Sequence, residues 1–276
     1  MKLHEKYKLA LITGATSGIG KALSVALANE KVSLILTGRD QSQLSQLASY
    51  LRPHVNVTFI CADLMNQNDL EKLKNLINEK TPDLVINSAG IGLYGDALTY
   101  ETYSQLKILD VNARALTEIT LEAARSLKSK NKKGTILNIS SAASFFTFPS
   151  FSLYAASKAY VNSFSQSLDA ELRKDKIRVF VACPGQVDTN FGKNAGRTNP
   201  KKSSKYPMNP QEAAKELIYQ LKYDIPVHIF DWRTRYLIFI SKWLPKKIIQ
   251  RILRKSVLSR IDKRPFLQTN SSNQKN

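Results

Sequence analysis

The sequence predicts one doubly wound α/β domain with a parallel sheet of seven strands. Its 276 residues, of which 43% are hydrophobic, can build one large core without requiring a second domain. Short apolar runs rich in β-branched residues alternate with segments of helical periodicity. Because these runs are apolar almost throughout, each strand is expected to be buried between two helical layers, as in a parallel sheet. The runs lie at residues 9–12, 32–36, 55–61, 84–87, 135–139, 179–182 and 227–230.

A glycine-rich turn follows the first strand. Residues 13–20 read Thr-Gly-Ala-Thr-Ser-Gly-Ile-Gly and lead into a predicted helix. Glycines let a backbone approach a pyrophosphate closely, and a helix N-terminus offers free N–H groups and the positive end of its dipole. The turn therefore predicts a Rossmann-type dinucleotide site. Its glycines at 14, 18 and 20 do not follow the Gly-x-Gly-x-x-Gly spacing, so a plain flexible turn is the alternative.

The ends of the second and third strands carry side chains that indicate which dinucleotide binds. An acidic residue at the tip of the second strand is typical of NAD sites, because it binds the ribose diol. Thr37 stands there instead, and Arg39 follows, which could pair with a 2′-phosphate. NADP(H) is therefore favoured over NAD(H), with an exposed loop charge as the alternative for Arg39. Asp63 could accept a hydrogen bond from an adenine amino group, or act as a helix cap or turn residue.

A tyrosine and a lysine on one helix face follow the fifth strand. Tyr154 and Lys158 are four positions apart, so their side chains project from the same side. A free tyrosine has a pKa near 10, and a fixed positive neighbour lowers it. The pair predicts a proton-transfer device, although an ordinary exposed helix face is the alternative. The helix also carries an apolar stripe that would pack on the sheet, formed by Val161, Phe164, Leu168 and Leu172.

The last helix and strand of the predicted domain have clear start signals. Asn209 and Pro210 stand in the cap-then-proline order of a helix start, and Pro226 precedes the last strand. We expect a catalytic domain over residues 1–230, a basic amphipathic extension over 231–266 and a disordered polar tail over 267–276.

These residues occur in the order and spacing of the classical short-chain dehydrogenases/reductases, which the chain resembles from about residue 8 to residue 230. The motifs that carry the resemblance are Thr13-Gly14-x-x-x-Gly18-x-Gly20, Asn87-Ser88-Ala89-Gly90, Asn112, Ser141, Tyr154-x-x-x-Lys158 and Pro184-Gly185-x-Val187-x-Thr189. Ser88 replaces the second asparagine usual in that motif. The resemblance implies an enzyme that interconverts a ketone and a secondary alcohol by hydride transfer with NAD(P).

The resemblance also implies a role for each catalytic residue. Tyr154 would protonate the carbonyl oxygen during reduction or deprotonate the alcohol in reverse, and Ser141 would polarise the same oxygen. Ser140 is the neighbouring candidate, and the family's spacing favours Ser141. Lys158 would lower the tyrosine pKa and bind the nicotinamide ribose. Asn112 would hold a water molecule that links Lys158 to solvent.

The coenzyme contacts carry over in the same way. The glycine turn would surround the pyrophosphate, the Asn87 motif would lie beside the adenosine half and the central sheet, and Val187 and Thr189 would meet the carboxamide. Ser17 stands where many NADP-dependent members carry a basic residue, which leaves the coenzyme choice to Arg39. The predicted coenzyme set is Gly14, Ser17, Gly18, Ile19, Gly20, Arg39, Asp63, Asn87, Ala89, Gly90, Tyr154, Lys158, Pro184, Gly185, Val187 and Thr189.

The net charge of +19 is high for a metabolic enzyme and indicates a polyanionic neighbour. A phosphate-bearing ligand, nucleic acid and an anionic membrane would all fit, but no nucleic-acid-binding motif accompanies the charge, so that partner is not expected. Cys61 and Cys183 end apolar runs and form no metal-ligand spacing, which predicts buried thiols, no metal site and a reducing, cytoplasmic compartment. The apolar run near the N-terminus is too short for a signal sequence or a membrane span.

The extension combines apolar and basic residues in a helical pattern over 236–264. The apolar side is formed by Ile248, Ile249, Ile252, Leu253 and Val257, and the basic side by Lys246, Lys247, Arg251, Arg254 and Lys255. Such a helix near Trp243 is typical of an anchor that lies on an anionic membrane. The alternatives are a helix packed over the substrate cleft or on a dimer partner. The extension resembles those of 3-oxoacyl and 3-ketosphinganine reductases, which implies a long-chain, lipid-like ketone.

Two further expectations concern the substrate and the assembly. The basic segment 191–208 would cover the substrate. The family resemblance suggests a homodimer or homotetramer. A non-catalytic dinucleotide sensor or membrane-associated scaffold on the same fold is the alternative function, and the retained set of catalytic side chains argues against it.

Overall fold

The computed structural model describes residues 2–198, 207–241 and 243–261. Its strands are β1 (Leu9–Thr13), β2 (Ser33–Gly38), β3 (Val57–Cys61), β4 (Leu84–Asn87), β5 (Gly134–Ile139), β6 (Ile177–Cys183) and β7 (Val227–Ile229). Its α-helices are α1 (Leu3–Lys6), α2 (Gly18–Asn29), α3 (Gln41–Leu51), α4 (Gln67–Lys80), α5 (Thr102–Leu109), α6 (Leu116–Ser129), α7 (Ser152–Leu172), α8 (Phe191–Asn194), α9 (Pro210–Lys222), α10 (Trp232–Ser241) and α11 (Lys246–Leu258). Shorter turns are η1 (Ala97–Thr99), η2 (Asp110–Ala115), η3 (Ala142–Phe145) and η4 (Arg173–Asp175).

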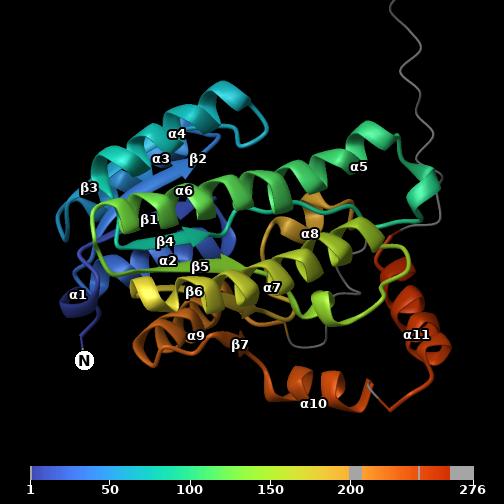
Figure 1. Ribbon diagram of the computed structural model, residues 1–276. Helices are drawn as coiled ribbons and strands as arrows, with labels where there is room; N and C mark the ends of the chain where they lie inside the picture. The colour runs from blue at the N-terminus through green and yellow to red at the C-terminus, as the bar shows by residue number, and fades with distance from the viewer. Residues whose placement is uncertain (1, 199–206, 242, 262–276) are drawn as a thin grey trace, which may run out of the picture.

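The described strands form one parallel, seven-stranded sheet in the order β3-β2-β1-β4-β5-β6-β7 (Figure 1). The predicted strands are confirmed, with ends that differ by one or two residues. The chain builds outward from β1 to β3 and then crosses back to place β4 on the other side of β1. Sheets of this kind bind ligands at the carboxyl ends of the strands where the order reverses. A site is therefore expected beyond the ends of β1 and β4.

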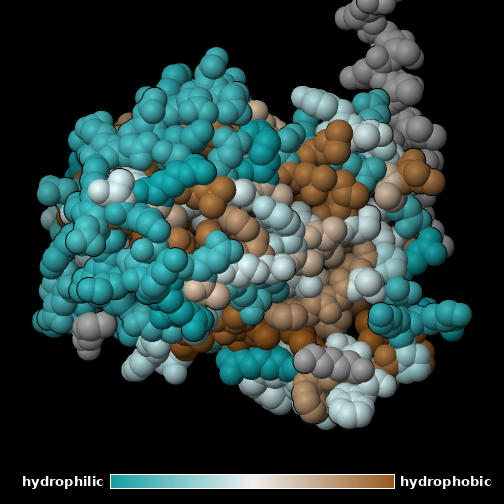
Figure 2. Space-filling model, in the orientation of Figure 1, coloured by the Kyte–Doolittle hydropathy of each residue, from teal (hydrophilic) through white to brown (hydrophobic). Residues whose placement is uncertain are grey.

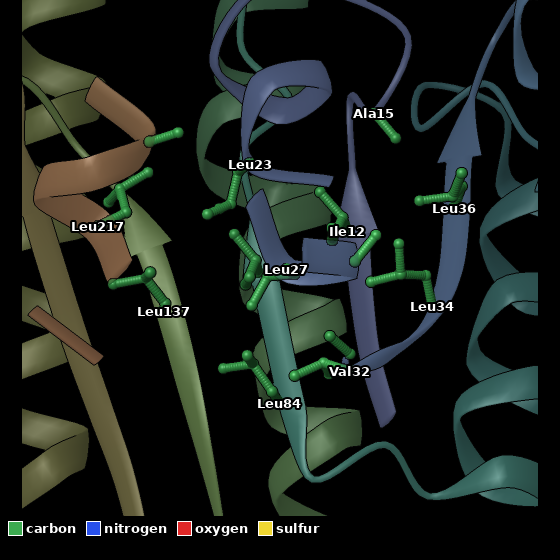
Figure 3. Packing of buried hydrophobic residues seen from close by; sticks show 14 of the residues in the cluster. Ile12, Ala15, Leu23, Leu27, Val32, Leu34, Leu36, Leu84, Leu137 and Leu217 are labelled. Atoms are coloured by element: carbon green, nitrogen blue, oxygen red, sulfur yellow. The ribbon is translucent and has the colours of Figure 1, made fainter. Parts of the chain in front are cut away.

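Side chains alternate between the two faces of the sheet, and helices cover each face. Ile12 and Leu36 pack in one layer with residues of α2, α3 and α9 (Figure 3). Leu11 and Ile35, their neighbours along the same strands, pack in the other layer with residues of α4, α6 and α7. The inner strands β1, β2, β4, β5 and β6 therefore bury both faces, which explains why their sequences are apolar without a polar alternation, whereas the edge strands β3 and β7 are only partly buried.

Local signals fix the ends of the helices that frame the site. The predicted start of α9 is confirmed: Asn209 accepts a hydrogen bond from the Glu212 N–H, and the Glu212 side chain bonds back to the Asn209 N–H. The apolar stripe of α7 packs on the sheet as expected. Cys183 is buried as predicted, whereas Cys61 is only partly buried.

A π-helical turn joins two helices into one long rod. η2 connects α5 to α6, and Figure 1 shows the two helices nearly in line beside α7. Such turns are rare in proteins and occur often at functional sites. Asn112, one of the predicted catalytic residues, lies in this turn and is fully buried.

The extension forms two helices, α10 and α11, and α11 packs near the N-terminal end of α7 (Figure 1). Its predicted apolar side is split between two surroundings. Val257 is buried in the body of the protein, whereas Ile248 and Ile252 are exposed. No helix among the described residues has both the length and the apolar character that crossing a membrane requires. The predicted disordered tail and Lys201, Lys202 and Lys205 of the predicted cover lie outside the described residues.

Candidate active site

A cavity of about 660 Å³ opens beyond the carboxyl ends of the strands. Most of the predicted site residues line it: Gly14, Ser17, Gly18, Ile19, Arg39, Asp63, Ala89, Gly90, Ser141, Tyr154, Lys158, Pro184, Gly185, Val187 and Thr189. These residues come from seven separate parts of the chain, and the fold brings them to one place. Gly20, Asn87 and Asn112 are not in the cavity wall.

Gly20 and Asn87 lie outside the cavity wall and have structural roles. A Cβ atom on Gly20 would lie 2.3 Å from the Gly14 oxygen, so this glycine allows α2 to pack against the turn. Asn87 is buried within the sheet, where it donates to Thr120 (3.0 Å) and to Asn138 (2.8 Å). Its role here is to join β4 to β5 and α6, so the expected direct contact of Asn87 with the coenzyme stays a prediction.

The glycine turn forms a cradle that fits a phosphate group. Gly14 and Gly18 have φ angles of +66° and +52°, in the left-handed region that favours glycine. A Cβ atom on Gly18 would lie 3.0 Å from the Thr189 methyl group, so the turn and the Pro184–Thr189 segment are in close contact. The α2 N-terminus behind the turn has no side-chain cap, because Ser17 makes no capping hydrogen bond. Its first N–H groups therefore point a positive dipole end at the cradle.

Arg39 and Asp63, which were predicted to contact the adenosine half of the coenzyme, both line the cavity. Arg39 is exposed and lines the wall. Asp63 also lines it, and one of its carboxylate oxygens accepts a hydrogen bond from the Met65 N–H at 3.0 Å. Asp63 is therefore a turn residue, one of its predicted roles, and its other oxygen makes no hydrogen bond within the described residues. The Thr37 hydroxyl is buried in the same wall and has no hydrogen-bond partner among the described residues. This orphan group and the glycine cradle fit a dinucleotide.

The structure separates the roles of the two neighbouring serines. Ser140 is buried and donates from its hydroxyl to the Lys158 carbonyl at 2.8 Å, so it ties β5 to α7. Ser141 is half-buried, accepts from the Ala143 N–H at 3.1 Å and makes a side-chain hydrogen bond with Tyr154. Ser141 is therefore the hydroxyl that can reach a carbonyl oxygen held by the tyrosine, as the family spacing implies.

Burial dominates the titration of the tyrosine and the lysine. It raises the pKa of Tyr154 well above 10, and the hydrogen bond with Ser141 offsets only part of that rise. Burial lowers the pKa of Lys158 to about 8. The lysine ammonium donates to the Ile139 carbonyl at 2.8 Å and lies 5.8 Å from the Tyr154 ring centroid. The expected lowering of the tyrosine pKa is therefore wrong for this arrangement, because the charge is satisfied by the backbone while the phenol is desolvated.

Asn112 clamps the loop that follows β4. Its side-chain oxygen accepts from the Ile91 N–H, and its amide donates to the Ile91 carbonyl, both at 2.9 Å. A second amide hydrogen reaches Ser157 on α7 at 3.1 Å. These contacts fix the backbone beside Gly90, where a Cβ atom would lie 3.4 Å from the Lys158 ammonium. The expected water-holding role of Asn112 stays a prediction.

Aromatic residues outside the predicted catalytic and coenzyme sets surround the tyrosine. Phe151 stacks on Tyr154 with centroids 4.3 Å apart, and Tyr94 stacks on Phe151 at 4.5 Å. Phe191 also contacts Tyr154, with ring centroids 5.3 Å apart. Phe191 is the first residue of the segment predicted to cover the substrate, and it lines the cavity wall. The positions of Tyr94 and Phe151 depend on loops that no local pattern describes.

Comparison with known proteins identifies the family. A family model described as short chain dehydrogenase matches residues 8–200. An uncharacterized oxidoreductase of Staphylococcus saprophyticus is 32% identical over 232 residues, with 83% of this chain and 97% of that protein covered. One of Staphylococcus aureus strain MW2 is 31% identical over 230 residues, with coverage of 83% and 96%. The chain belongs to the short-chain dehydrogenase family.

Several solved dehydrogenase structures share its fold. One from Sphingobium yanoikuyae, in complex with NADPH, is 26% identical with a TM-score of 0.76, and the match covers 93% of this chain and 97% of that one. A bulky-bulky ketone specific alcohol dehydrogenase from Comamonas testosteroni is 28% identical with a TM-score of 0.74, covering 93% and 95%. A Burkholderia phymatum member in complex with NAD is 22% identical with a TM-score of 0.75, covering 89% and 95%. This short-chain dehydrogenase is thus an NAD(P)-dependent oxidoreductase of the class that acts on small-molecule ketones or alcohols.

Proposed function

We propose that this enzyme uses NADP(H) to interconvert a bulky, lipid-like ketone and its secondary alcohol. The observation that carries the proposal is the position of Tyr154, which lines the coenzyme cavity and also belongs to an apolar, aromatic cluster. The Tyr154 hydroxyl would therefore lie beside both the coenzyme and the ketone. A bound nicotinamide would supply or accept the hydride at this junction.

The proton step would use the described side chains. Tyr154 is protonated because burial raises its pKa, so it can give its proton to a carbonyl oxygen during reduction. Ser141, which already bonds the tyrosine, would donate to the same oxygen and hold it in line. Lys158, with its pKa near 8, would stabilise the phenolate that remains. The site thus contains an acid, an orienting hydroxyl and a charge-balancing cation.

The wall around Tyr154 favours an apolar substrate of some size. The hydrophobic cluster that contains the tyrosine is formed by Tyr94, Ala143, Phe151, Ala195 and Val257, with Phe148, Phe191 and Ile261 against it. Flat aromatic surfaces of this kind pack against hydrocarbon and offer few polar partners. The Comamonas neighbour, specific for bulky-bulky ketones, is consistent with this choice.

A screen of NADPH oxidation would test the proposal. The substrates would be long-chain ketoacyl thioesters, ketosphingoid bases, steroid ketones and a small ketone such as acetone, each followed at 340 nm with NADPH and with NADH. We expect turnover of at least one bulky apolar ketone and little turnover of acetone. Turnover confined to small polar ketones, or none with any carbonyl compound, would exclude the proposed substrate class.

Arg39 is expected to determine the coenzyme choice. Replacing it in Arg39→Ala should weaken NADPH binding by roughly 10- to 100-fold, since a charge-assisted contact to a phosphate is lost, while NADH binding stays nearly unchanged. Fluorescence titration of both coenzymes would measure this. Arg125→Ala is a matched control, because Arg125 is an exposed arginine on α6 outside the cavity wall. Equal weakening of both coenzymes would contradict the assignment.

We also propose that the outer surface of α10 and α11 contacts an anionic membrane from the cytoplasmic side. Its exposed apolar side chains are Trp232, Tyr236, Leu237, Phe239, Trp243, Leu244, Ile248 and Ile252. Cations stand among them on α11, namely Lys246, Lys247, Arg251 and Lys255. Figure 2 shows hydrophobic and hydrophilic atoms side by side over this part of the molecule. An apolar surface with a cationic border fits an anionic lipid interface, which supplies both hydrocarbon and negative charge.

Variants of this outer surface would test the membrane contact without disturbing the core. Ile248→Ser with Ile252→Ser should reduce flotation with phosphatidylcholine–phosphatidylglycerol vesicles several-fold, because two apolar side chains no longer enter the interface. Tyr50→Ser is the matched control, since Tyr50 is an exposed apolar residue on α3. Equal flotation of both variants, or flotation that does not depend on the anionic lipid, would refute the contact. Deletion of the whole extension is a poor test, because Val257 is part of the substrate-side cluster.

A further inference from the structure

The inner side of α11 packs against the aromatic cluster that contains Tyr154. Val257 is 0% exposed and lies in the hydrophobic cluster that contains Tyr94, Phe151 and Tyr154. Ile261, three residues beyond the end of α11, packs against the same cluster. α11 therefore ends against the aromatic stack that supports the tyrosine. A displacement of α11 would remove Val257 from this cluster and loosen its packing around Phe151 and Tyr154.

Asp96 is where α11 is fastened to the loops beside that stack. One of its carboxylate oxygens accepts from the Ser150 hydroxyl at 2.5 Å, and the other accepts from the Arg254 guanidinium at 2.9 Å. The Gly95 N–H adds a backbone bond to the Ser150 carbonyl at 2.9 Å. The hydrogen bond from Ser150 and the charge of Arg254 hold the pKa of Asp96 below its usual range. The carboxylate thus joins three segments that are far apart in the sequence.

Ser150 links this carboxylate to the active site. Its φ angle of +62° lies in the left-handed region, which is unfavourable for a serine and needs support from its surroundings. The next residue, Phe151, is the N-cap of α7 and stacks on Tyr154. The path from Arg254 through Asp96 and Ser150 therefore ends on the ring that positions the proton donor.

Other contacts hold α11 in the same place. The Gln250 amide donates to Thr147 at 3.1 Å, and the Arg260 guanidinium lies 5.7 Å from the Tyr94 ring centroid. The Arg260 carbonyl accepts from the Thr198 N–H at 3.1 Å. Among the described residues, Arg254 and Asp96 form the one ion pair between α11 and the rest of the chain. Because both side chains are about half exposed, the pair by itself is weak, and its effect depends on the Ser150 bond beside it.

We propose that Asp96 is a positioning residue that fastens the C-terminal helix to the aromatic wall, and that this contact determines how well bulky ketones are accepted. The inference rests on the proposed function for its choice of substrate. Asp96 touches neither reactant. It acts through Ser150 and Phe151 on one side and through Arg254 and Val257 on the other.

Asp96→Ala should raise KM for a bulky apolar ketone by roughly 5- to 30-fold, since a charge-assisted hydrogen bond and a hydroxyl hydrogen bond are lost together. The turnover of a small ketone, which is low in the wild type, and the Kd for NADPH should both stay nearly unchanged. Asp96→Asn should lie between, because the amide oxygen can still accept from Ser150. Arg254→Ala combined with Asp96→Ala should cost less than the sum of the two single effects, as expected for residues in one network.

A matched control is Asp175→Ala, which removes an ion pair of similar length with Lys128 at a site away from the cavity. A rise in KM that is equal for small and bulky ketones, a parallel loss of NADPH affinity, or additive effects of Asp96→Ala and Arg254→Ala would overturn the proposal.

A second measurement keeps the inference separate from the proposed function. Hydrogen exchange should be faster over α11 and residues 147–151 in Asp96→Ala than in the wild type, whether or not a substrate is known. If no ketone is reduced but exchange rises at both segments, the proposed function fails and the fastening role stands. Unchanged exchange at both segments would refute the fastening role.

Discussion

Tyr154→Phe is expected to lower kcat for ketone reduction by roughly 10²- to 10⁴-fold, the usual contribution of a general acid. The variant removes only the hydroxyl, so the ring can keep its stack on Phe151 and its contact with Phe191. NADPH affinity should therefore stay nearly unchanged, as should the free energy of unfolding. Stopped-flow or steady-state oxidation of NADPH, with a fluorescence titration of the coenzyme, would separate the two effects.

Tyr160→Phe is the matched control for this substitution. Tyr160 lies on the same helix but is exposed, and its hydroxyl bonds Thr117 rather than facing the cavity. This variant should keep its activity. If Tyr154→Phe retained most of its turnover, the proton would have to come from another group and the proposed mechanism would be lost.

Lys158→Met is expected to make the protein more stable at neutral pH while impairing its activity. Burial lowers the lysine pKa from 10.5 to about 8, so keeping the folded state charged costs about 3 kcal/mol relative to the unfolded state. Methionine avoids that cost but leaves the Ile139 carbonyl without its donor, a loss of about 1 kcal/mol. The net gain in the free energy of unfolding should be roughly 2 kcal/mol at pH 7.

The sign of the pH dependence follows from the direction of the shift. Between pH 8 and 10.5 the unfolded lysine keeps its proton while the folded one releases it, so wild-type stability rises with pH relative to the variant. The advantage of Lys158→Met should thus be largest below pH 8 and disappear toward pH 10.5. Urea unfolding of both proteins at several pH values would measure it, with Lys133→Met, at an exposed lysine, as control. A variant less stable than the wild type at pH 7 would contradict the argument.

The fold could be predicted from the sequence because its strands are buried on both faces. Runs such as 84–87 have no polar alternation, and this pattern belongs to a parallel sheet whatever the loops do. The glycine turn could also be predicted, because Gly14 and Gly18 adopt φ angles that other residues avoid, so the sequence requires glycine there. Which side of α11 is buried could not be predicted from the sequence. Val257 and Ile252 both appear on one apolar side of the sequence pattern, yet one is buried and the other exposed, because the side a helix buries depends on partners distant in the chain.

The candidate site could be predicted as a set of residues but not as a set of contacts. Asn112, Tyr154 and Lys158 are where the motif order implies, at or directly behind the cavity. The partner of the Lys158 ammonium is a backbone carbonyl, and no residue pattern encodes a backbone oxygen. The same holds for Asp96, whose partners Ser150 and Arg254 come from two separate segments. Short-range spacing identifies chemistry on one helix, whereas these contacts depend on how loops close.

The π-helical turn makes this part of the chain unusually sensitive to a change in length. An α-helix turns about 100° per residue, so removing one residue between positions 110 and 115 would restore regular helix and rotate everything on one side by that angle. Asn112 would then leave the Ile91 peptide, and α5 would present a different face to the cavity. The regular α-helix would have the more favourable local backbone hydrogen bonds, so local stability does not explain the π-helical turn. Single-residue deletions, which surface loops tolerate, should therefore abolish activity here. The number of residues in this segment is itself required for function, because it fixes the rotation of α5 relative to α6.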